Sequence, residues 1–194
     1  MKASYFGLIF FISMSLSGCS LFNLQQDGQE LEHQLNQIQQ WQVRGKLSVI
    51  SPEDAVTGYL TWQQDEEDFD LFLSGPFGQG SSRLEGNSSH ATLTLPSKEP
   101  VRAPSAEYLV AAYLGWDFPV LDLRYWVKGQ PSPNSSFTQV RNNLGLLESL
   151  KQHDWQVQFS RYQPQGDTWL PGRIKIIGHG FKFILVIKEW SIYE

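Results

Sequence analysis

The stretch Trp41-Gln42-Val43-Arg44-Gly45-Lys46-Leu47-Ser48-Val49 decides the fold, because apolar and polar side chains alternate along it. Alternation with a period of two predicts a strand with one buried face and one exposed face. The same alternation returns at 56–62 and at 69–73, and short polar turns at 51–54 and 65–68 separate these segments. Consecutive strands joined by such turns are typical of an antiparallel meander. The sequence therefore predicts a sheet that begins at this stretch.

The rest of the chain predicts further strands of the same kind. Apolar residues alternate at 91–95, 155–159 and 174–176, and shorter strands are expected near 82–84 and 137–140. After the turn Gly178-His179-Gly180, the segment 181–187 is apolar on both faces, which predicts cover on both sides of this strand. The segment 144–152 fits a short helix or a strand equally well, because its leucines recur at a spacing of three.

Two helices are predicted in the middle of the chain and one before the first strand. Ser105 can cap a helix that ends at Gly115, and Pro119 can open the next helix. The Gln-rich segment 24–40 carries a narrow apolar stripe at helical spacing, which is typical of a surface helix. We therefore predict a mainly β (α+β) domain, in which a large antiparallel sheet receives two helices mid-chain.

The N-terminal segment predicts export and a lipid anchor. The apolar run 5–16 is shorter than the roughly 20 residues that span a bilayer, so it indicates the core of a secretory signal. Leu16-Ser17-Gly18-Cys19 resembles a bacterial lipobox, in which the thiol receives a diacylglyceryl group and becomes the new N-terminus. Cys19 is the only cysteine, so no disulfide partner competes for it. The alternative is an exported protein with a free thiol.

These features divide the chain into three parts. We expect residues 1–18 to be a cleaved signal peptide, 19–23 to form a lipidated tether and 24–194 to fold as one domain. In the enterobacterial sorting pattern, Asp after the cysteine favours retention in the inner membrane. Ser20 stands there, so we expect the chain to be anchored to the outer membrane and to face the periplasm.

Composition and motifs exclude several classes of function. The formal net charge of −5 lacks the basic excess of a nucleic-acid-binding protein. The four histidines have no ligand-like spacing, so no metal site is expected. No Gly-x-Ser-x-Gly elbow and no complete phosphate-binding glycine loop occurs, and Gly78-Gln79-Gly80 lacks the third glycine of the dinucleotide pattern. We therefore expect no enzyme and no cofactor besides the lipid on Cys19.

Several motifs, in consistent order, resemble the LolB family of outer-membrane lipoproteins. They are Trp41-Gln42-Val43-Arg44-Gly45, Trp62-Gln63-Gln64, Gly75-Pro76-Phe77-Gly78, the stretch Leu114-Gly115-Trp116-Asp117-Phe118-Pro119-Val120 with Leu123, Trp126, Gly129 and Pro131 after it, and finally Trp155 and Trp190. The resemblance implies an incomplete antiparallel β-barrel that encloses helices, with an apolar cavity between them. It also implies an acceptor that takes triacylated lipoproteins from the soluble periplasmic carrier LolA and inserts them into the outer membrane, a step that needs no ATP if affinity rises from donor to bilayer.

The resemblance also suggests roles for single residues. Phe77 takes the place of the apolar residue, typically leucine, that protrudes from the loop after the third strand and is needed for delivery into the bilayer. The alternative for Phe77 is a hairpin turn in which the ring folds back on the sheet. Candidates for lining the cavity are Trp41, Leu47, Trp62, Leu71, Leu73, Leu123, Trp126 and Trp155. For each of these, ordinary core packing is the open alternative.

Two other functions remain open at this stage. A lipid-anchored protein could bind another amphiphile in the same cavity without a protein donor. The seven tryptophans could also form a protein interface, which would make the chain a structural subunit of an envelope complex. The expected partners under the leading hypothesis are a LolA-like carrier, acylated lipoprotein cargo and outer-membrane lipid, with no nucleic acid and a monomeric chain.

Overall fold

The computed structural model describes residues 30–75, 80–133 and 135–193, so the signal segment and the tether lie outside the described residues. Eleven strands form one sheet: β1 (Gln40–Ile50), β2 (Ala55–Asp65), β3 (Asp68–Ser74), β4 (Ser81–Gly86), β5 (Ala91–Thr94), β6 (Val101–Ala103), β7 (Phe137–Arg141), β8 (Leu147–Gln152), β9 (Trp155–Ser160), β12 (Arg173–Gly178) and β13 (Phe181–Tyr193). A separate hairpin joins β10 (Gln163–Gln165) and β11 (Thr168–Leu170).

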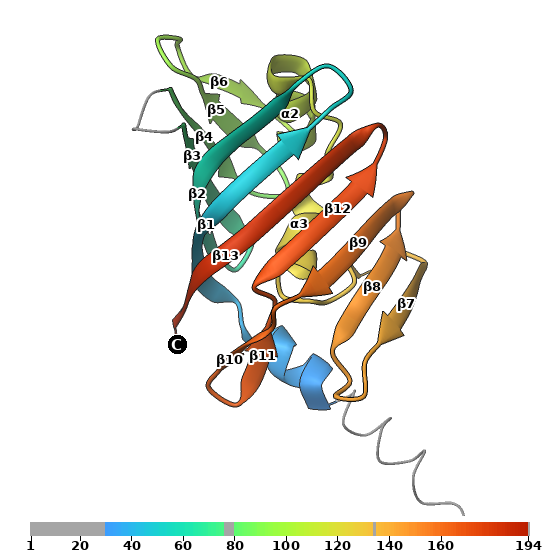
Figure 1. Cartoon of the computed structure of the whole chain (residues 1–194). Helices are drawn as coiled ribbons and strands as arrows, with labels where there is room; N and C mark the ends of the chain where they lie inside the picture. Colours follow the sequence, from blue (N-terminus) through green and yellow to red (C-terminus); the bar gives the residue numbers. More distant parts are fainter. Residues whose placement is uncertain (1–29, 76–79, 134, 194) are drawn as a thin grey trace, which may run out of the picture.

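The large sheet is antiparallel at every junction and runs in the order β6-β5-β4-β3-β2-β1-β13-β12-β9-β8-β7. The first and last strands of the chain, β1 and β13, therefore lie side by side in its centre. The edges are β6 and β7, which leaves the barrel open between them. Figure 1 shows the sheet curving around the helices. The predicted mainly β fold, an incomplete antiparallel barrel that encloses helices, is confirmed.

The helical insert between β6 and β7 comprises α2 (Ala106–Leu114), α3 (Val120–Trp126) and the linker 115–119 between them. The Ser105 hydroxyl accepts a hydrogen bond from the backbone N–H of Tyr108, and Gly115 ends α2 with φ 71°. α3 begins directly after Pro119. The insert covers the concave face of the sheet (Figure 1). α2 thus starts and ends where its capping residues predict, and α3 starts where Pro119 predicts.

Two other segments clarify what the sequence left open. Residues 30–37 are helical, and Leu35 and Ile38 are buried on the apolar stripe. The ambiguous segment 144–152 contains strand β8, which pairs with β9. The prediction that the last strand is covered on both faces is wrong. Its inner residues are buried, but Ile184 and Val186 on the outer face are only half-buried, because the insert covers the concave face alone.

The buried side chains form two clusters on the concave face. The larger cluster joins α3 to the central strands and to the half of the sheet that ends at β7, and it contains Trp41, Trp62, Trp126, Trp155 and Trp190. The smaller cluster joins α2 to β3, β4 and β5. Trp116 and Phe118 of the linker are partly buried against both clusters. We therefore expect incomplete packing at the boundary between the two clusters.

Candidate functional site

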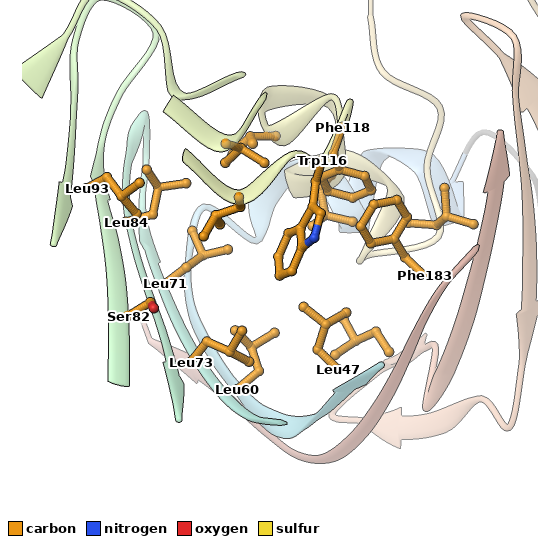
Figure 2. A pocket seen from close by; sticks show the side chains of 16 residues that line it. Leu47, Leu60, Leu71, Leu73, Ser82, Leu84, Leu93, Trp116, Phe118 and Phe183 are labelled. Atoms are coloured by element: carbon orange, nitrogen blue, oxygen red, sulfur yellow. The ribbon is translucent and has the colours of Figure 1, made fainter. Parts of the chain in front are cut away.

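A cavity of about 80 Å³ lies at this boundary, between the concave face of the sheet and the helical insert. Figure 2 shows it with the curved sheet on one side and Trp116 and Phe118 on the other. The side chains that line it belong to Leu47, Leu60, Leu71, Leu73, Ser82, Leu84, Leu93, Val110, Leu114, Trp116, Phe118, Val120, Leu123, Ile176, Phe183 and Leu185.

The chemistry of the lining selects for hydrocarbon. Among the described residues that line the cavity, none is charged, and Ser82 alone carries a hydroxyl. A polar ligand would lose its hydrogen bonds to water here and find almost no replacement, which is unfavourable. An aliphatic chain would instead exchange water for methyl and methylene groups. The geometry therefore favours an apolar ligand.

The strand pattern explains the wall formed by the sheet. Alternation places Leu47 of β1, Leu60 of β2 and Leu71 and Leu73 of β3 on the concave face. The register sets Leu60 opposite Leu73, and Leu71 opposite Leu84 of β4. Direct cross-strand neighbours lie close enough to form a continuous surface. The result is an aliphatic wall that runs across four adjacent strands.

The linker 115–119 forms an aromatic wall opposite the leucines. The Phe118 and Phe183 ring centroids lie 4.2 Å apart, and those of Trp116 and Phe183 lie 6.2 Å apart in an edge-on arrangement. Trp155 contacts this group from β9, with its centroid 5.8 Å from that of Phe118. In Figure 2 the Trp116 ring reaches into the cavity toward Leu47. These ring contacts fasten the linker to the sheet.

Two histidine–aspartate pairs add polar contacts between the insert and the sheet. His179 in the β12–β13 turn lies 3.1 Å from Asp117 of the linker, measured from Nδ1 to Oδ2. His153 in the β8–β9 turn lies 3.1 Å from Asp122 of α3 between the same atom types. The His179 ring also stacks on Trp155. Because these pairs are partly exposed, each holds the insert only weakly.

The structure separates the predicted lining residues by type. The four leucine candidates, Leu47, Leu71, Leu73 and Leu123, lie on the cavity wall. The four tryptophan candidates differ from that expectation and pack in the larger core cluster instead: Trp41, Trp62, Trp126 and Trp155. For each candidate, the alternative was ordinary core packing. The four tryptophans follow that alternative.

Ring packing and amide partners explain the burial of these tryptophans. The Trp41 centroid lies 4.7 Å from that of Trp62 in an edge-on pair. The Trp62 indole N–H donates to Gln64 Oε1 at 3.1 Å, and that of Trp126 donates to Gln152 Oε1 at 2.9 Å. A buried indole needs such an acceptor. All four rings are buried, and the N–H groups of Trp62 and Trp126 are bonded to glutamines, so these side chains belong to the core and not to the cavity wall.

Trp116 and Phe118 are lining residues that were not among the candidates. A local signal for them exists, because Gly115 and Pro119 interrupt the helical pattern and leave two large aromatics on a short connection. Aromatics so placed have no helix face of their own to cover. Cys19 and Phe77, the predicted lipidation and insertion residues, lie outside the described residues.

Within residues 30–75, 80–133 and 135–193, no group of three or more potential ligands is arranged to hold a metal ion. No helix in these ranges is long and apolar enough to cross a membrane. The apolar cavity is therefore the candidate site that the described residues support.

Solved structures with a similar fold share little sequence with this chain. One is a LolA superfamily protein from Nitrosomonas europaea, with a TM-score of 0.56 and 9% identity over 86% of this chain and 94% of that chain. Another is a putative outer membrane lipoprotein-sorting protein domain from Vibrio parahaemolyticus, with a TM-score of 0.56 and 11% identity over 86% of this chain and 92% of that chain. At such identities the likeness establishes the fold alone.

Sequence relatives establish more. The family model described as outer membrane lipoprotein LolB matches residues 39–190. The outer-membrane lipoprotein LolB of Pseudomonas fluorescens is 35% identical over 94% of this chain and 94% of its own length. That of Pseudomonas syringae pv. syringae is 37% identical over 84% of this chain and 79% of its own length. The chain therefore belongs to the LolB family of outer-membrane lipoproteins.

Proposed function

We propose that this protein accepts the acyl chains of triacylated lipoproteins from a LolA-like periplasmic carrier and inserts these lipoproteins into the outer membrane without ATP. The observation that carries the proposal is the cavity, whose lining is apolar apart from one serine hydroxyl. Acyl chains in water expose methylenes at about 0.8 kcal/mol each. A lined cavity removes this penalty during transfer, and no energy source is needed if affinity rises from carrier to acceptor to bilayer.

The size of the cavity implies that cargo must widen it. Pockets that bury small ligands typically hold roughly 300–1,000 Å³, whereas this one holds about 80 Å³. The strands of the wall are fixed by backbone pairing on both sides, while the insert is held by side-chain contacts. Entry of acyl chains therefore moves the insert away from the sheet. The contacts that give way are the ring pair Phe118–Phe183 and the two histidine–aspartate pairs.

The membrane-facing roles of Cys19 and Phe77 complete the proposal. Cys19 carries the lipid anchor, and family membership together with Ser20 supports an outer-membrane location. Phe77 belongs to the connection between β3 and β4, and these strands contribute Leu73 and Ser82 to the cavity wall. Burial of one Phe contributes at most about 1.5–3 kcal/mol. That is too little to anchor a protein, but enough to disturb the bilayer locally.

A transfer assay with matched variants tests the acceptor role. A version that starts after Cys19 is mixed with LolA loaded with radiolabelled lipoprotein, and the label is followed without ATP. Leu73→Glu places a charge in the cavity, whereas Phe72→Glu places it on the outer face of the same strand. We expect label to move to the parent protein and to Phe72→Glu, and to stay on LolA with Leu73→Glu.

The outcomes separate the three functions. Equal transfer to both glutamate variants would contradict the assignment of the cavity as the acceptor site. Label that stays on LolA while the parent protein binds a fluorescent fatty acid would favour another amphiphile as the ligand. Failure of both with folded protein would favour a structural subunit. Phe77→Glu in the lipidated protein tests insertion separately, and full delivery into outer-membrane vesicles would remove Phe77 from the mechanism.

A further inference from the structure

Beside the Arg44–Glu189 pair, the outer face of the sheet centre carries a group of four further cations on three adjacent strands. We call this set the basic face; it consists of Lys46 on β1, Lys182 on β13, and Arg173 and Lys175 on β12. The three strands pair in the order β1-β13-β12, at the front of the sheet in Figure 1, and the insert with its cavity lies behind them. The basic face is therefore on the opposite side of the sheet from the cavity.

The strand register mixes these cations with aliphatic side chains. Val186 of β13 is the direct cross-strand partner of Lys46 on one side and of Arg173 on the other. Ile184 is the partner of Lys175. Ile184 and Val186 are half-buried, and no layer formed by the described residues covers their outer face. On this surface, lysine and arginine side chains thus surround a small aliphatic centre.

The four cations of the basic face have no carboxylate partner among the described residues. Among the described residues, none of its four cations lies within 4.0 Å of a carboxylate, although Arg83 pairs with Asp70 at 2.6 Å and Arg44 with Glu189 at 3.9 Å. The whole chain has a formal net charge of −5, so this face has the opposite sign to the molecule as a whole. Lys46 also lies over the Tyr59 ring, with Nζ 5.1 Å from its centroid. Lysine, arginine, tyrosine and short aliphatic groups together are typical of surfaces that rest on lipid headgroups.

We propose that the basic face lies against the anionic phospholipid headgroups of the membrane that holds the lipid anchor. This inference rests on the proposed lipidation of Cys19. Ten residues lie between Cys19 and Glu30, the first described residue, so the tether reaches at most roughly 40 Å and the domain stays near the membrane surface. A weak attraction then suffices to select an orientation. Each cation near an anionic surface favours the bound orientation roughly fivefold.

A membrane fits this face better than an acidic protein does. The described residues of the face form an open, gently curved sheet surface, and the cavity lies behind it. A protein partner would need a complementary shape, whereas headgroups adapt to any such surface. With the basic face on the membrane, the sheet lies between the bilayer and the insert. The insert then faces the periplasm, where a carrier arrives.

The orientation can be measured in the full-length lipidated protein. Once Cys19 carries lipid, a fluorescent label can be attached to a single new thiol, either Thr57→Cys on the outer face of β2 or Ala112→Cys on the exposed side of α2. Each protein is reconstituted into vesicles that contain headgroup spin-labelled lipid, with or without 30% phosphatidylglycerol. We expect strong quenching at residue 57 and weak quenching at residue 112, and only in the anionic vesicles.

Two charge-matched triple variants make the test specific. Lys46→Gln/Lys175→Gln/Lys182→Gln removes three cations of the basic face, and Lys98→Gln/Arg102→Gln/Arg161→Gln removes three exposed cations elsewhere. The first triple should shift the orientation equilibrium on the order of 100-fold and abolish the difference between the two labels, and the second should leave it intact. Equal effects of the two triples, or quenching that ignores the anionic lipid, would overturn the proposal.

Two further results distinguish the possible failures. If the parent protein does not float with vesicles at all, the proposed lipidation of Cys19 is wrong, and the membrane orientation that rests on it is overturned as well. If the protein floats and the first triple changes the rate of transfer from loaded LolA but not the quenching, the face docks a protein, and the membrane orientation is overturned. Thermal unfolding of each triple checks that the fold is intact.

Discussion

The concave face of one sheet contains a tryptophan-packed region and a leucine-lined region, and the two differ in packing although they share strands. On β2, Trp62 is 1% exposed in the core, while Leu60, two residues earlier on the same face, borders the cavity. On β1, Trp41 is 1% exposed and Leu47, on the same face, is only partly buried. Backbone pairing is continuous through both regions. The strands themselves therefore do not decide where the void lies.

Two factors account for the difference in packing. They are the size of the side chains and the strength of the contacts that hold the opposite wall. In the tryptophan-packed region, large rings fill the space and Gln64 and Gln152 satisfy two of the indole N–H groups. In the leucine-lined region, short side chains face an insert that is held by ring contacts and by two partly exposed histidine–aspartate pairs. One region is thus fully packed, and the other leaves a space, which the proposed function requires to widen for cargo. The predictions below test this division.

The largest expected effect is loss of stability in the tryptophan-packed region. Trp126 is 0% exposed, so Trp126→Ala should lower the free energy of unfolding by about 3–5 kcal/mol, because it leaves a cavity in a close-packed core. Trp169→Ala is the matched control, since Trp169 is 44% exposed on β11 and its loss should cost less than about 1 kcal/mol. Urea unfolding of the version that starts after Cys19 measures both. Similar losses for the two variants would mean that this region is not close-packed.

A buried cation in the tryptophan-packed region predicts a smaller, pH-dependent effect. Lys128 Nζ donates to the backbone carbonyls of Leu35 and Ile38 at 3.0 Å each, at the end of the helical segment 30–37. Burial and the nearby Arg124 lower the pKa of Lys128 to about 8 from its ordinary value of 10.5. Below pH 8 both the folded and the unfolded state bind this proton. Between pH 8 and 10.5 the unfolded state binds it more tightly, so stability should rise with pH in this window.

The comparison with Lys128→Met isolates this contribution. Other groups titrate in both proteins, so the difference between the two free energies of unfolding reports on Lys128. We expect the parent protein to gain on the order of 1–3 kcal/mol relative to Lys128→Met from pH 8 to 10.5. A difference that stays flat across this window would show that the ammonium is well solvated in the folded state. Urea unfolding at four or five pH values is sufficient.

Local sequence signals were enough for most of the elements, but not for the void. Alternation predicted the strands, and Ser105, Gly115 and Pro119 predicted the helix boundaries, because each is a local effect. Leu60 and Trp62 share a strand, a face and a period, so no local signal tells which of them borders a cavity. That depends on where the insert lies, and this is a long-range property of the chain. Segment 144–152 was ambiguous for the same reason, since pairing with β9 decides it.

The smallest change in stability should accompany a clear change in function. Ser82 lies on the cavity wall opposite Leu73, and Ser81 is exposed beside it on the same strand. Ser82→Leu adds methyl groups to an existing void, so it should raise the free energy of unfolding by about 0.5–1 kcal/mol. The same change fills space that acyl chains need, so transfer from loaded LolA should slow.

Ser81→Leu is the neighbouring control and should leave transfer unchanged. The two readouts have opposite signs only if the leucine-lined region is kept open at a cost in stability. If Ser82→Leu stabilises the protein and leaves transfer untouched, acyl chains do not use this part of the wall. If it destabilises the protein, the wall is already packed, and the division between the two regions of the sheet fails. A gain in stability with a loss of transfer would show that the void is retained because the cargo requires it.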